Sequence, residues 1–332
     1  MTSLFLFAIF ISFLLLLFVI YLSHKYKLFI DRSDYDKPQN FHIHSTPRAG
    51  GFGILFGMLL LLLTPLGIKF IPSIVLAFLS GIFEDLHNSL SPKFRLFLQL
   101  IAALCAVWLT DSVVTYLGLG ISMPYWMGIL FSVFAIVGMM NAVNIIDGFN
   151  GLASGTILLI LFSFGTISYQ QDNFELLSII LITLGATIGF FILNFPKGKI
   201  FLGDGGAYLL GFIVAIIGIF LASNYESVSP WYILAIFIYP VWEVIFSIGR
   251  KLFIGISPME PDSYHFHMLI YRQITKNNAL TSLFILCMIS PFITISTLFF
   301  NHSISNIIIA GFFILCYLLV YFYLYKKEKN NI

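Results

Sequence analysis

Long apolar segments dominate the chain, and short polar stretches separate them. A helix needs about 20 mostly apolar residues to cross the hydrocarbon core of a bilayer. Eleven segments are candidates, and the third is the shortest: 4–23, 50–66, 70–83, 95–110, 124–141, 152–168, 175–193, 206–222, 231–248, 279–300 and 304–325. Apolar residues run on without alternating with polar ones, so the pattern predicts helices rather than the strands of a membrane barrel.

The first segment is predicted to be a membrane helix rather than a signal peptide. No basic residue precedes it, and the basic stretch "HKYK" follows it, which reverses the flank order of a signal peptide. Its apolar run of about 20 residues is also longer than a signal-peptide core.

Composition agrees with this pattern. The chain is 59% hydrophobic and 10% charged, whereas soluble domains carry about 25% charged residues. We therefore expect an all-α polytopic membrane protein of about eleven helices, forming a single integral-membrane domain over residues 1–332. The net charge of +2 gives no reason to expect nucleic acid as a partner.

The basic residues predict an orientation. If the N-terminus lies outside and the chain crosses eleven times, 16 of the 17 lysines and arginines fall on the cytoplasmic side. Lys69 alone falls outside. This distribution follows the positive-inside rule and places the C-terminus in the cytoplasm.

Five polar clusters share that predicted cytoplasmic side. They lie near residues 24–49, 84–94, 141–151, 194–205 and 249–278. The connections predicted to lie outside have no comparable clusters. Polarity on one side of the membrane indicates a functional site at the cytoplasmic membrane surface.

Carboxylates and amides mark three of these clusters. Glu84 and Asp85 are adjacent and repel each other unless a cation or a proton intervenes. Asn144 and Asp147 are three residues apart and share a helix face. Asp204 lies in "GDGG". A solvated helix end, a glycine-rich packing seam and a polar turn are the structural alternatives for the three clusters.

These side chains suit a hard divalent cation. Carboxylate and amide oxygens favour Mg²⁺, or Mn²⁺, over zinc, and Mg²⁺ commonly bridges carboxylates to substrate phosphates. Arg48, Lys199 and Arg272 are candidates for holding those phosphates. Together these residues predict metal-assisted phosphoryl chemistry.

The remaining candidates are less specific. His265 and His267 are two residues apart and do not share a helix face, so a phosphate-binding or capping loop is favoured over a zinc pair, with a structural role left open. Glu243 lies in the ninth segment, where an acid indicates either a functional site or a side chain that reaches the interface.

The clusters, in this order, resemble the polyprenyl-phosphate N-acetylhexosamine-1-phosphate transferases, which are glycosyltransferases of family 4. The most specific stretches are "NAVNIIDGFNGLASG" (141–155) and "KIFLGDGG" (199–206), which follow "ED" and precede "HFH". The opening "DKPQNFH" and "TPRAGG" is similar to the WecA-like branch.

The resemblance implies a reaction and its participants. A UDP-N-acetylhexosamine would give its sugar 1-phosphate to undecaprenyl phosphate, releasing UMP and requiring Mg²⁺. UDP-N-acetylglucosamine is the first candidate donor. This would be the first membrane step of a cell-surface polysaccharide, such as O-antigen lipopolysaccharide or another cell-wall glycan, at the inner membrane of a bacterium. Homodimerisation is left open.

The resemblance also assigns roles to residues of this chain. Glu84 and Asp85 would engage the lipid phosphate, and Asp147 would be a catalytic acid of the "NxxNxxDG" motif. Asp204 and Asn144 would hold Mg²⁺, and Phe201 would stack on uracil.

The chain departs from the family pattern at several positions. Glu84 replaces the usual aspartate, and Asn150, a candidate substrate-binding residue, stands where a second acid is common. "HFH" stands where enzymes of the peptidoglycan branch carry three histidines, which favours another donor.

Two other classes of function remain open from the sequence. A secondary transporter or cation-coupled carrier also uses acids in membrane helices, but such sites lie near the midplane and often within inverted repeats. No internal repeat is visible here. A scaffold protein that has lost catalysis is the third reading.

Overall fold

The structure is a computed structural model that describes residues 1–29, 46–87, 91–257, 260 and 263–330. Parts of three predicted site loops, those near 24–49, 84–94 and 249–278, therefore lie outside the described residues.

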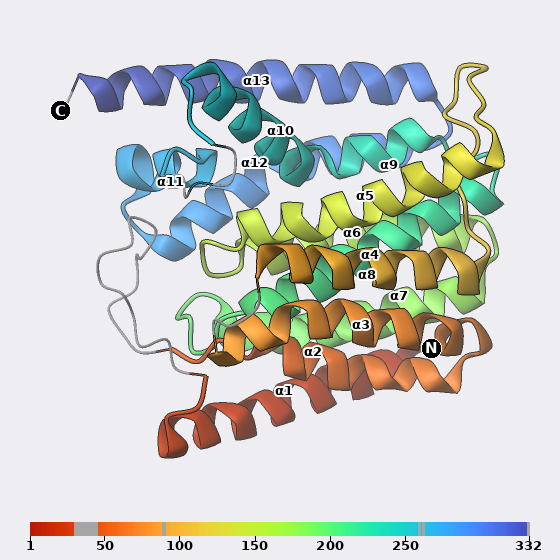
Figure 1. Cartoon of the computed structure of the whole chain (residues 1–332), viewed down its shortest axis with the longest axis horizontal. Helices are drawn as coiled ribbons and strands as arrows, with labels where there is room; N and C mark the ends of the chain where they lie inside the picture. Colours follow the sequence, from red (N-terminus) through yellow and green to blue (C-terminus); the bar gives the residue numbers. More distant parts are fainter. Residues whose placement is uncertain (30–45, 88–90, 258–259, 261–262, 331–332) are drawn as a thin grey trace.

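Helices make up almost all of the described chain (Figure 1). They are α1 Thr2–Tyr26, α2 Gly50–Met58, the 3₁₀ helix η1 Leu59–Leu63, α3 Pro65–His87, α4 Pro92–Thr110, α5 Tyr125–Ile146, α6 Leu152–Gln170, α7 Phe174–Asn194, α8 Gly203–Asn224, α9 Pro230–Ile236, α10 Ile238–Phe253, α11 Phe266–Ile270, the π-helix η2 Tyr271–Thr275, α12 Asn278–Leu298 and α13 Ser303–Lys329. The prediction of an all-α membrane protein is confirmed.

The count of eleven spanning helices needs correction. Within the described residues, nine helices are long and apolar enough to span a bilayer, or ten if the bent pair α9 and α10 forms one span. The second predicted segment (50–66) is the one that is too short, because α2 and η1 together cover only Gly50–Leu63. The third segment, predicted to be the shortest, belongs to the 23-residue helix α3.

Prolines explain both differences. Thr64 adopts an extended conformation before Pro65, as residues that precede proline prefer, and this ends the helical turn that η1 began. Pro240 has no N–H to donate to the carbonyl of Ile236, four residues earlier. The chain bends there by 75° between α9 and α10.

The core surrounds α8. This helix is apolar on every face. In its most apolar stretch of 18 residues, 89% is buried, as expected for a helix enclosed by others. Helices α2, α3, α5 and α6 all pack against it. Helices α1 and α13 lie at opposite edges of the bundle (Figure 1). Only 17% of the most apolar 18-residue stretch of α1 is buried, and only 28% of that of α13.

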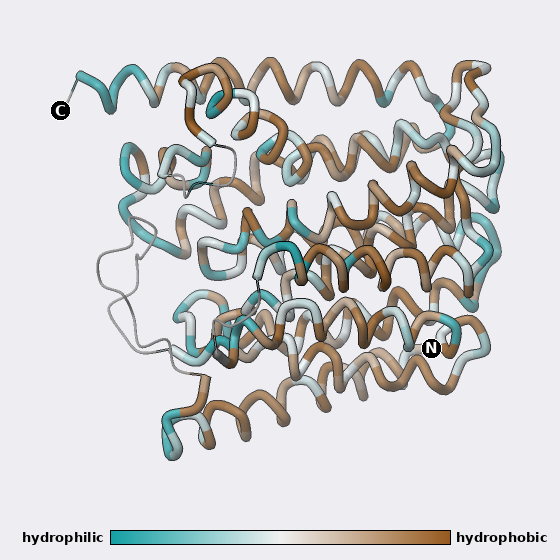
Figure 2. Tube along the Cα trace, viewed as in Figure 1, coloured by the Kyte–Doolittle hydropathy of each residue, from teal (hydrophilic) through white to brown (hydrophobic). Residues whose placement is uncertain are grey.

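The helices run roughly side by side, and the polar connections gather at their ends (Figure 2). Figure 1 places the connections α5–α6 and α7–α8, the last turn of α3 and the first turn of α4 at the same end as the last turns of α13. The four connections that follow α4, α6, α8 and α12 lie at the opposite end. The gathering of the five polar clusters on the cytoplasmic side remains a prediction.

Candidate functional site

The acids of α3 meet the beginning of α8. The Asp85 carboxylate accepts hydrogen bonds from the backbone N–H groups of Asp204 and Gly205, each over 2.9 Å. These N–H groups lie in the first turn of α8, where the helix supplies no partner of its own. Asp85 thus caps α8 from a neighbouring helix and fixes where Asp204 lies.

Glycines permit this close approach. Gly203 has φ of +76°, and a Cβ there would lie 2.7 Å from an Asp85 carboxylate oxygen. A Cβ on Gly81 would lie 2.4 Å from the backbone nitrogen of Gly205. Glycine is therefore required at positions 81 and 203 by the contact between α3 and α8.

Two arginines converge on the Asp204 carboxylate. Arg48 Nη2 lies 3.4 Å from Oδ1 and Arg95 Nη1 lies 3.1 Å from Oδ2. Arg48 Nε is also 3.9 Å from Asp85 Oδ1, and Arg95 Nη1 is 4.0 Å from Glu84 Oε2. Side chains from α3, α4, α8 and the segment before α2 thereby form one charged cluster.

Helix α5 brings the "NxxNxxD" residues to the same cluster. Asn144 Nδ2 donates a hydrogen bond to Asp204 Oδ1 over 3.1 Å. Asp147 is the C-cap of α5, where the helix ends. Burial raises the pKa of Asp147 to about 7; Arg48 opposes this rise and Asp204 adds to it. The charges on Arg48 and Asp204 are thus close enough to influence Asp147.

The backbone around Arg48 is fixed by pairing with the segment that leads into α8. Phe201 N–H donates to Pro47 O over 2.9 Å, and Gly50 N–H donates to Phe201 O over 2.8 Å. These bonds form a short parallel bridge between Arg48 and Phe201. The predicted phosphate-binding arginine and the predicted uracil-stacking aromatic are consequently neighbours.

Asn150 contacts the connection between α7 and α8. Its side-chain Nδ2 donates to Pro196 O over 3.1 Å, and its backbone N–H donates to Asn278 Oδ1 over 2.7 Å. Gly198, at φ +59°, lies against the Asn150 amide, because a Cβ there would be 2.7 Å from Nδ2. These contacts show Asn150 holding the loop; its predicted contact with substrate stays a prediction.

The two histidines are buried beside the connection between α5 and α6. The rings of His265 and His267 lie parallel, with centroids 5.4 Å apart. The His267 ring meets Phe149 edge to face at 5.6 Å. Only Gly148 separates Phe149 from Asp147, so the histidine pair borders the acid cluster.

The remaining two candidates differ in position. Lys199 is exposed on the connection between α7 and α8, two residues before Phe201. Arg272 is not brought into the acid cluster, because its Nη2 pairs with Glu328 Oε1 at 2.9 Å and donates to Ser263 O over 2.7 Å. The spacing in the sequence gave no sign that the end of α13 lies beside η2.

Sequence reasoning did not single out Arg95 as a site residue. The signal available was "SPKFR", in which Ser91 caps α4 and Pro92 begins it. This motif fixes the helix start but gives no information about which neighbouring helix Arg95 faces.

The donor atoms of the cluster suit a hard cation. Among the described residues, four carboxylates, those of Glu84, Asp85, Asp147 and Asp204, accompany two arginines, so negative charge is in excess there. Even so, no group of three or more His, Cys, Asp or Glu side chains is placed to hold one ion within the described residues. An ion on Asp204 would compete with Arg48 and Arg95, and Asn144 would have to present Oδ1 instead of Nδ2.

Comparisons with known proteins found a family model and several relatives that match part of the chain. Residues 68–222 match the model of glycosyl transferase family 4. The chain is 35% identical over 188 residues to a phospho-N-acetylmuramoyl-pentapeptide-transferase of Streptococcus agalactiae, covering 55% of this chain and 54% of that protein. Its counterpart in Streptococcus pneumoniae is 32% identical over 196 residues, covering 56% and 58%.

The match thus spans a little over half the length of these relatives. The matched region includes most of the charged cluster, from Glu84 to Asp204, while Arg48 and the two histidines lie outside it. The relatives do not confirm the WecA-like branch. Residues 68–222, a little under half of the chain, are therefore similar to glycosyl transferase family 4, and a little over half of the chain is similar to phospho-N-acetylmuramoyl-pentapeptide-transferases.

Proposed function

We propose that the protein transfers N-acetylhexosamine 1-phosphate from a UDP-sugar to undecaprenyl phosphate and releases UMP. The observation that carries the proposal is the convergence of Arg48, Arg95 and Asn144 on Asp204, at the polar end of an apolar bundle. Guanidinium groups bind phosphate well because their planar N–H groups match its oxygens. The same end of the bundle is where a lipid phosphate at the membrane surface would arrive.

Each residue then has a definite task. Arg48 and Arg95 hold the donor diphosphate and offset the repulsion between two anions. Asp85 keeps the first turn of α8 in place, and its neighbour Glu84 faces the incoming lipid phosphate. Asp147, with a pKa of about 7, is suited to accept a proton from that phosphate near neutral pH.

We propose Mg²⁺, or Mn²⁺, as the cofactor, held by Asp204 and Asn144. When bound, the ion would neutralise the diphosphate and stabilise charge on the departing UMP. The excess of acids over arginines in the cluster supports a cation there. Exposed Lys199 adds positive charge beside Phe201, which we propose as the surface for uracil.

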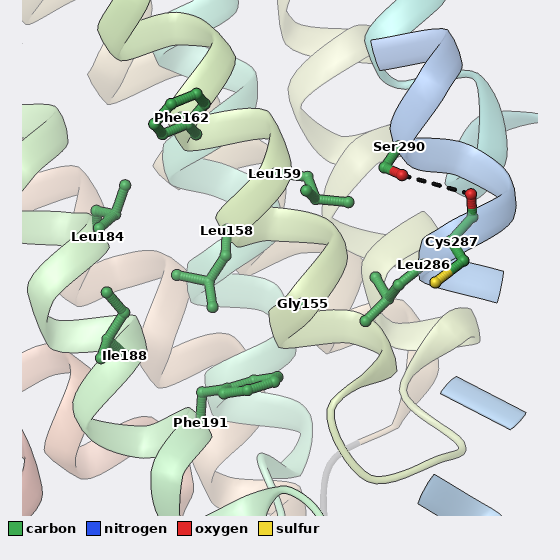
Figure 3. A pocket seen from close by; sticks show the side chains of 10 residues that line it. All are labelled: Gly155, Leu158, Leu159, Phe162, Leu184, Ile188, Phe191, Leu286, Cys287 and Ser290. Atoms are coloured by element: carbon green, nitrogen blue, oxygen red, sulfur yellow. Dashed lines mark hydrogen bonds between the residues drawn. The ribbon is translucent and has the colours of Figure 1, made fainter. Parts of the chain in front are cut away.

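The acceptor's hydrocarbon chain has a candidate location on the side of the bundle. A hollow of about 480 Å³ opens between α6, α7 and α12 (Figure 3). Its lining is almost wholly apolar and includes Leu158, Ile188 and Leu286. Phe191, also in the lining, lies in the last turn of α7, just before the connection that carries Lys199. A chain in the hollow would thus have its phosphate near the polar end.

Two versions of the proposed reaction differ in the donor sugar. UDP-N-acetylglucosamine is our first candidate, for a polysaccharide such as O-antigen, because "HFH" stands in place of three histidines. The named relatives favour UDP-N-acetylmuramoyl-pentapeptide and peptidoglycan synthesis. A transporter is disfavoured because the four acids of the charged cluster lie at the ends of α3, α5 and α8 and not along the middle of these helices.

A donor panel tests the proposal. Purified protein in nanodiscs would receive undecaprenyl phosphate, Mg²⁺ and one radiolabelled donor at a time: UDP-N-acetylglucosamine, UDP-N-acetylgalactosamine or UDP-N-acetylmuramoyl-pentapeptide. We expect label to enter the lipid fraction with equimolar UMP for one N-acetylhexosamine donor. Transfer from the pentapeptide donor alone would assign the peptidoglycan reaction, and no transfer from any donor would refute the proposal.

A further inference from the structure

A buried carboxylate outside the acid cluster holds the histidine segment. Glu243, on α10, has a side chain that is 1% exposed. Its Oε1 lies 2.9 Å from His265 Nδ1 and accepts a hydrogen bond from Phe266 N–H over 3.0 Å. Its Oε2 accepts from the Tyr317 hydroxyl of α13 over 2.8 Å.

These partners determine which nitrogen of His265 carries a proton toward Glu243. An ionised carboxylate only accepts hydrogen bonds, and its partners here, Phe266 N–H and the Tyr317 hydroxyl, both donate. His265 Nδ1 must therefore carry the hydrogen that lies toward Oε1. The contact fixes the ring orientation and leaves Nε2 at the opposite edge of the ring, as in sites where a carboxylate orients a functional histidine.

Helix α13 reinforces this arrangement along one face. The rings of Tyr317, Tyr321 and Tyr325 stack in sequence at centroid distances of 6.0 Å. Tyr321 donates to Tyr264 O over 3.1 Å, and Glu328 pairs with Arg272. Positions 317, 321, 325 and 328 follow helical spacing, so one face of α13 holds the segment from Tyr264 to Arg272.

The segment from Tyr264 to Arg272 lies next to the acid cluster at His267. The parallel rings of His265 and His267 place the second ring against Phe149. A Cβ on Gly148, the residue after Asp147, would lie 3.4 Å from His267 Nε2. Displacing His265 would therefore disturb the lining next to Asp147.

We propose that Glu243 and Tyr317 are positioning residues for sugar-phosphate transfer, acting by orienting His265 toward the donor diphosphate. This inference rests on the proposed function, because its kinetic test measures transfer from the UDP-sugar. Its structural half is the position of the proton on the His265 ring, which can be measured without turnover. Neither residue is expected to touch the substrate.

The structural half is tested by NMR of protein with ¹⁵N-labelled histidine in detergent micelles. The chain has seven histidines, and a His265→Asn variant assigns the His265 signals. We expect wild-type His265 to show the Nδ1-protonated form with a strongly deshielded Nδ1 proton, because charged acceptors make the stronger hydrogen bonds. Glu243→Gln should move that proton upfield, and Tyr317→Phe should move it less.

Tyr325→Phe is the matched control, because Tyr325 meets Tyr264 through its ring at 5.5 Å and is two helical turns from Tyr317. It should leave the His265 signals in place. Unchanged His265 signals in both Glu243→Gln and Tyr317→Phe would overturn the inference, as would a wild-type His265 protonated at Nε2 alone.

Kinetics test the functional half. Carboxylates that orient metal-binding histidines typically contribute 10- to 100-fold, and we take the same order for His265. We expect Glu243→Gln to lower kcat/KM for the UDP-sugar by roughly that factor, chiefly by raising KM, while KM for undecaprenyl phosphate stays near the wild-type value. Equal losses for both substrates, or no loss, would refute a positioning role. A wild-type protein that transfers nothing would instead refute the proposed function, and the NMR result would still decide the state of His265.

Discussion

Asp85 of α3 accepts both of its hydrogen bonds from the backbone of the α8 turn that carries Asp204. Two acids that are 119 residues apart in sequence are thereby joined through backbone N–H groups. The contact gives Asp85 a structural task besides the catalytic one predicted from the sequence. It also explains why Asp85 stands at the end of an apolar helix, since the first turn of a neighbouring helix favours negative charge.

Removing this cap should cost stability as well as activity. Asp85→Ala leaves two N–H groups of α8 without their acceptor, and losing a helix cap typically costs about 0.5–2 kcal/mol. We expect a lower thermal unfolding midpoint in detergent and loss of transfer. Glu84→Ala is the control, because Glu84 contacts Arg95 of α4 at 4.0 Å and does not cap α8 within the described residues. An unfolding midpoint for Asp85→Ala equal to that of the control would contradict the capping role.

Arg95 should be needed for donor binding. Arg95→Ala removes a guanidinium 3.1 Å from Asp204 and leaves that carboxylate with Arg48 and Asn144 as partners. We expect a roughly tenfold or larger increase in KM for the UDP-sugar, since losing a charge-assisted hydrogen bond costs about 1.5–3 kcal/mol. Lys93→Ala, an exposed change in the same turn of α4, should leave KM unchanged. Equal KM values for both variants would remove Arg95 from the site.

Asn150 should not tolerate replacement by an acid. Asn150→Asp replaces the Nδ2 donor, 3.1 Å from Pro196 O, with a carboxylate oxygen that cannot donate. We expect a loss of about 1–3 kcal/mol in stability, measured by thermal unfolding. Asn150→Ser should lose less, because a hydroxyl can still donate. A more stable or more active Asn150→Asp variant would show that the position serves catalysis instead.

The hollow beside α7 should select the acceptor chain. Leu158→Trp fills part of a space of about 480 Å³, and we expect KM for undecaprenyl phosphate to rise several-fold while KM for the UDP-sugar is unchanged. Phe134→Trp, on the lipid-exposed side of α5, serves as the control for an added ring. If Leu158→Trp leaves the acceptor KM unchanged, the chain lies elsewhere.

Much of the fold could be predicted because lipid imposes a simple rule. Every backbone N–H and C=O in hydrocarbon must be satisfied internally, so a continuous apolar run specifies a helix. The errors fell where proline interrupts such a run. Pro65 and Pro240 are visible in the sequence, but hydropathy alone does not distinguish a helix that proline begins or bends from one that continues.

The candidate site could be predicted only in part. Asp85, Asn144 and Asp204 stand out because polar residues are rare in this chain, and the structure brings them together. Arg95 and Arg272 look alike in sequence, since each is a basic residue in a polar connection. Their partners, Asp204 and Glu328, depend on how helices pack, and the spacing of residues along the chain carries no such information.

The most direct test of the account is transfer by Asp204→Asn, assayed beside wild type with Mg²⁺ and again with EDTA. Asp172→Asn, an acid at the opposite end of the bundle, is the control. We expect wild type and Asp172→Asn to release UMP and form lipid-linked sugar only with Mg²⁺. Asp204→Asn should lose roughly 100-fold or more in rate while its unfolding midpoint stays near that of wild type. Transfer by Asp204→Asn at the wild-type rate would contradict the claim that Asp204 is the centre of the site.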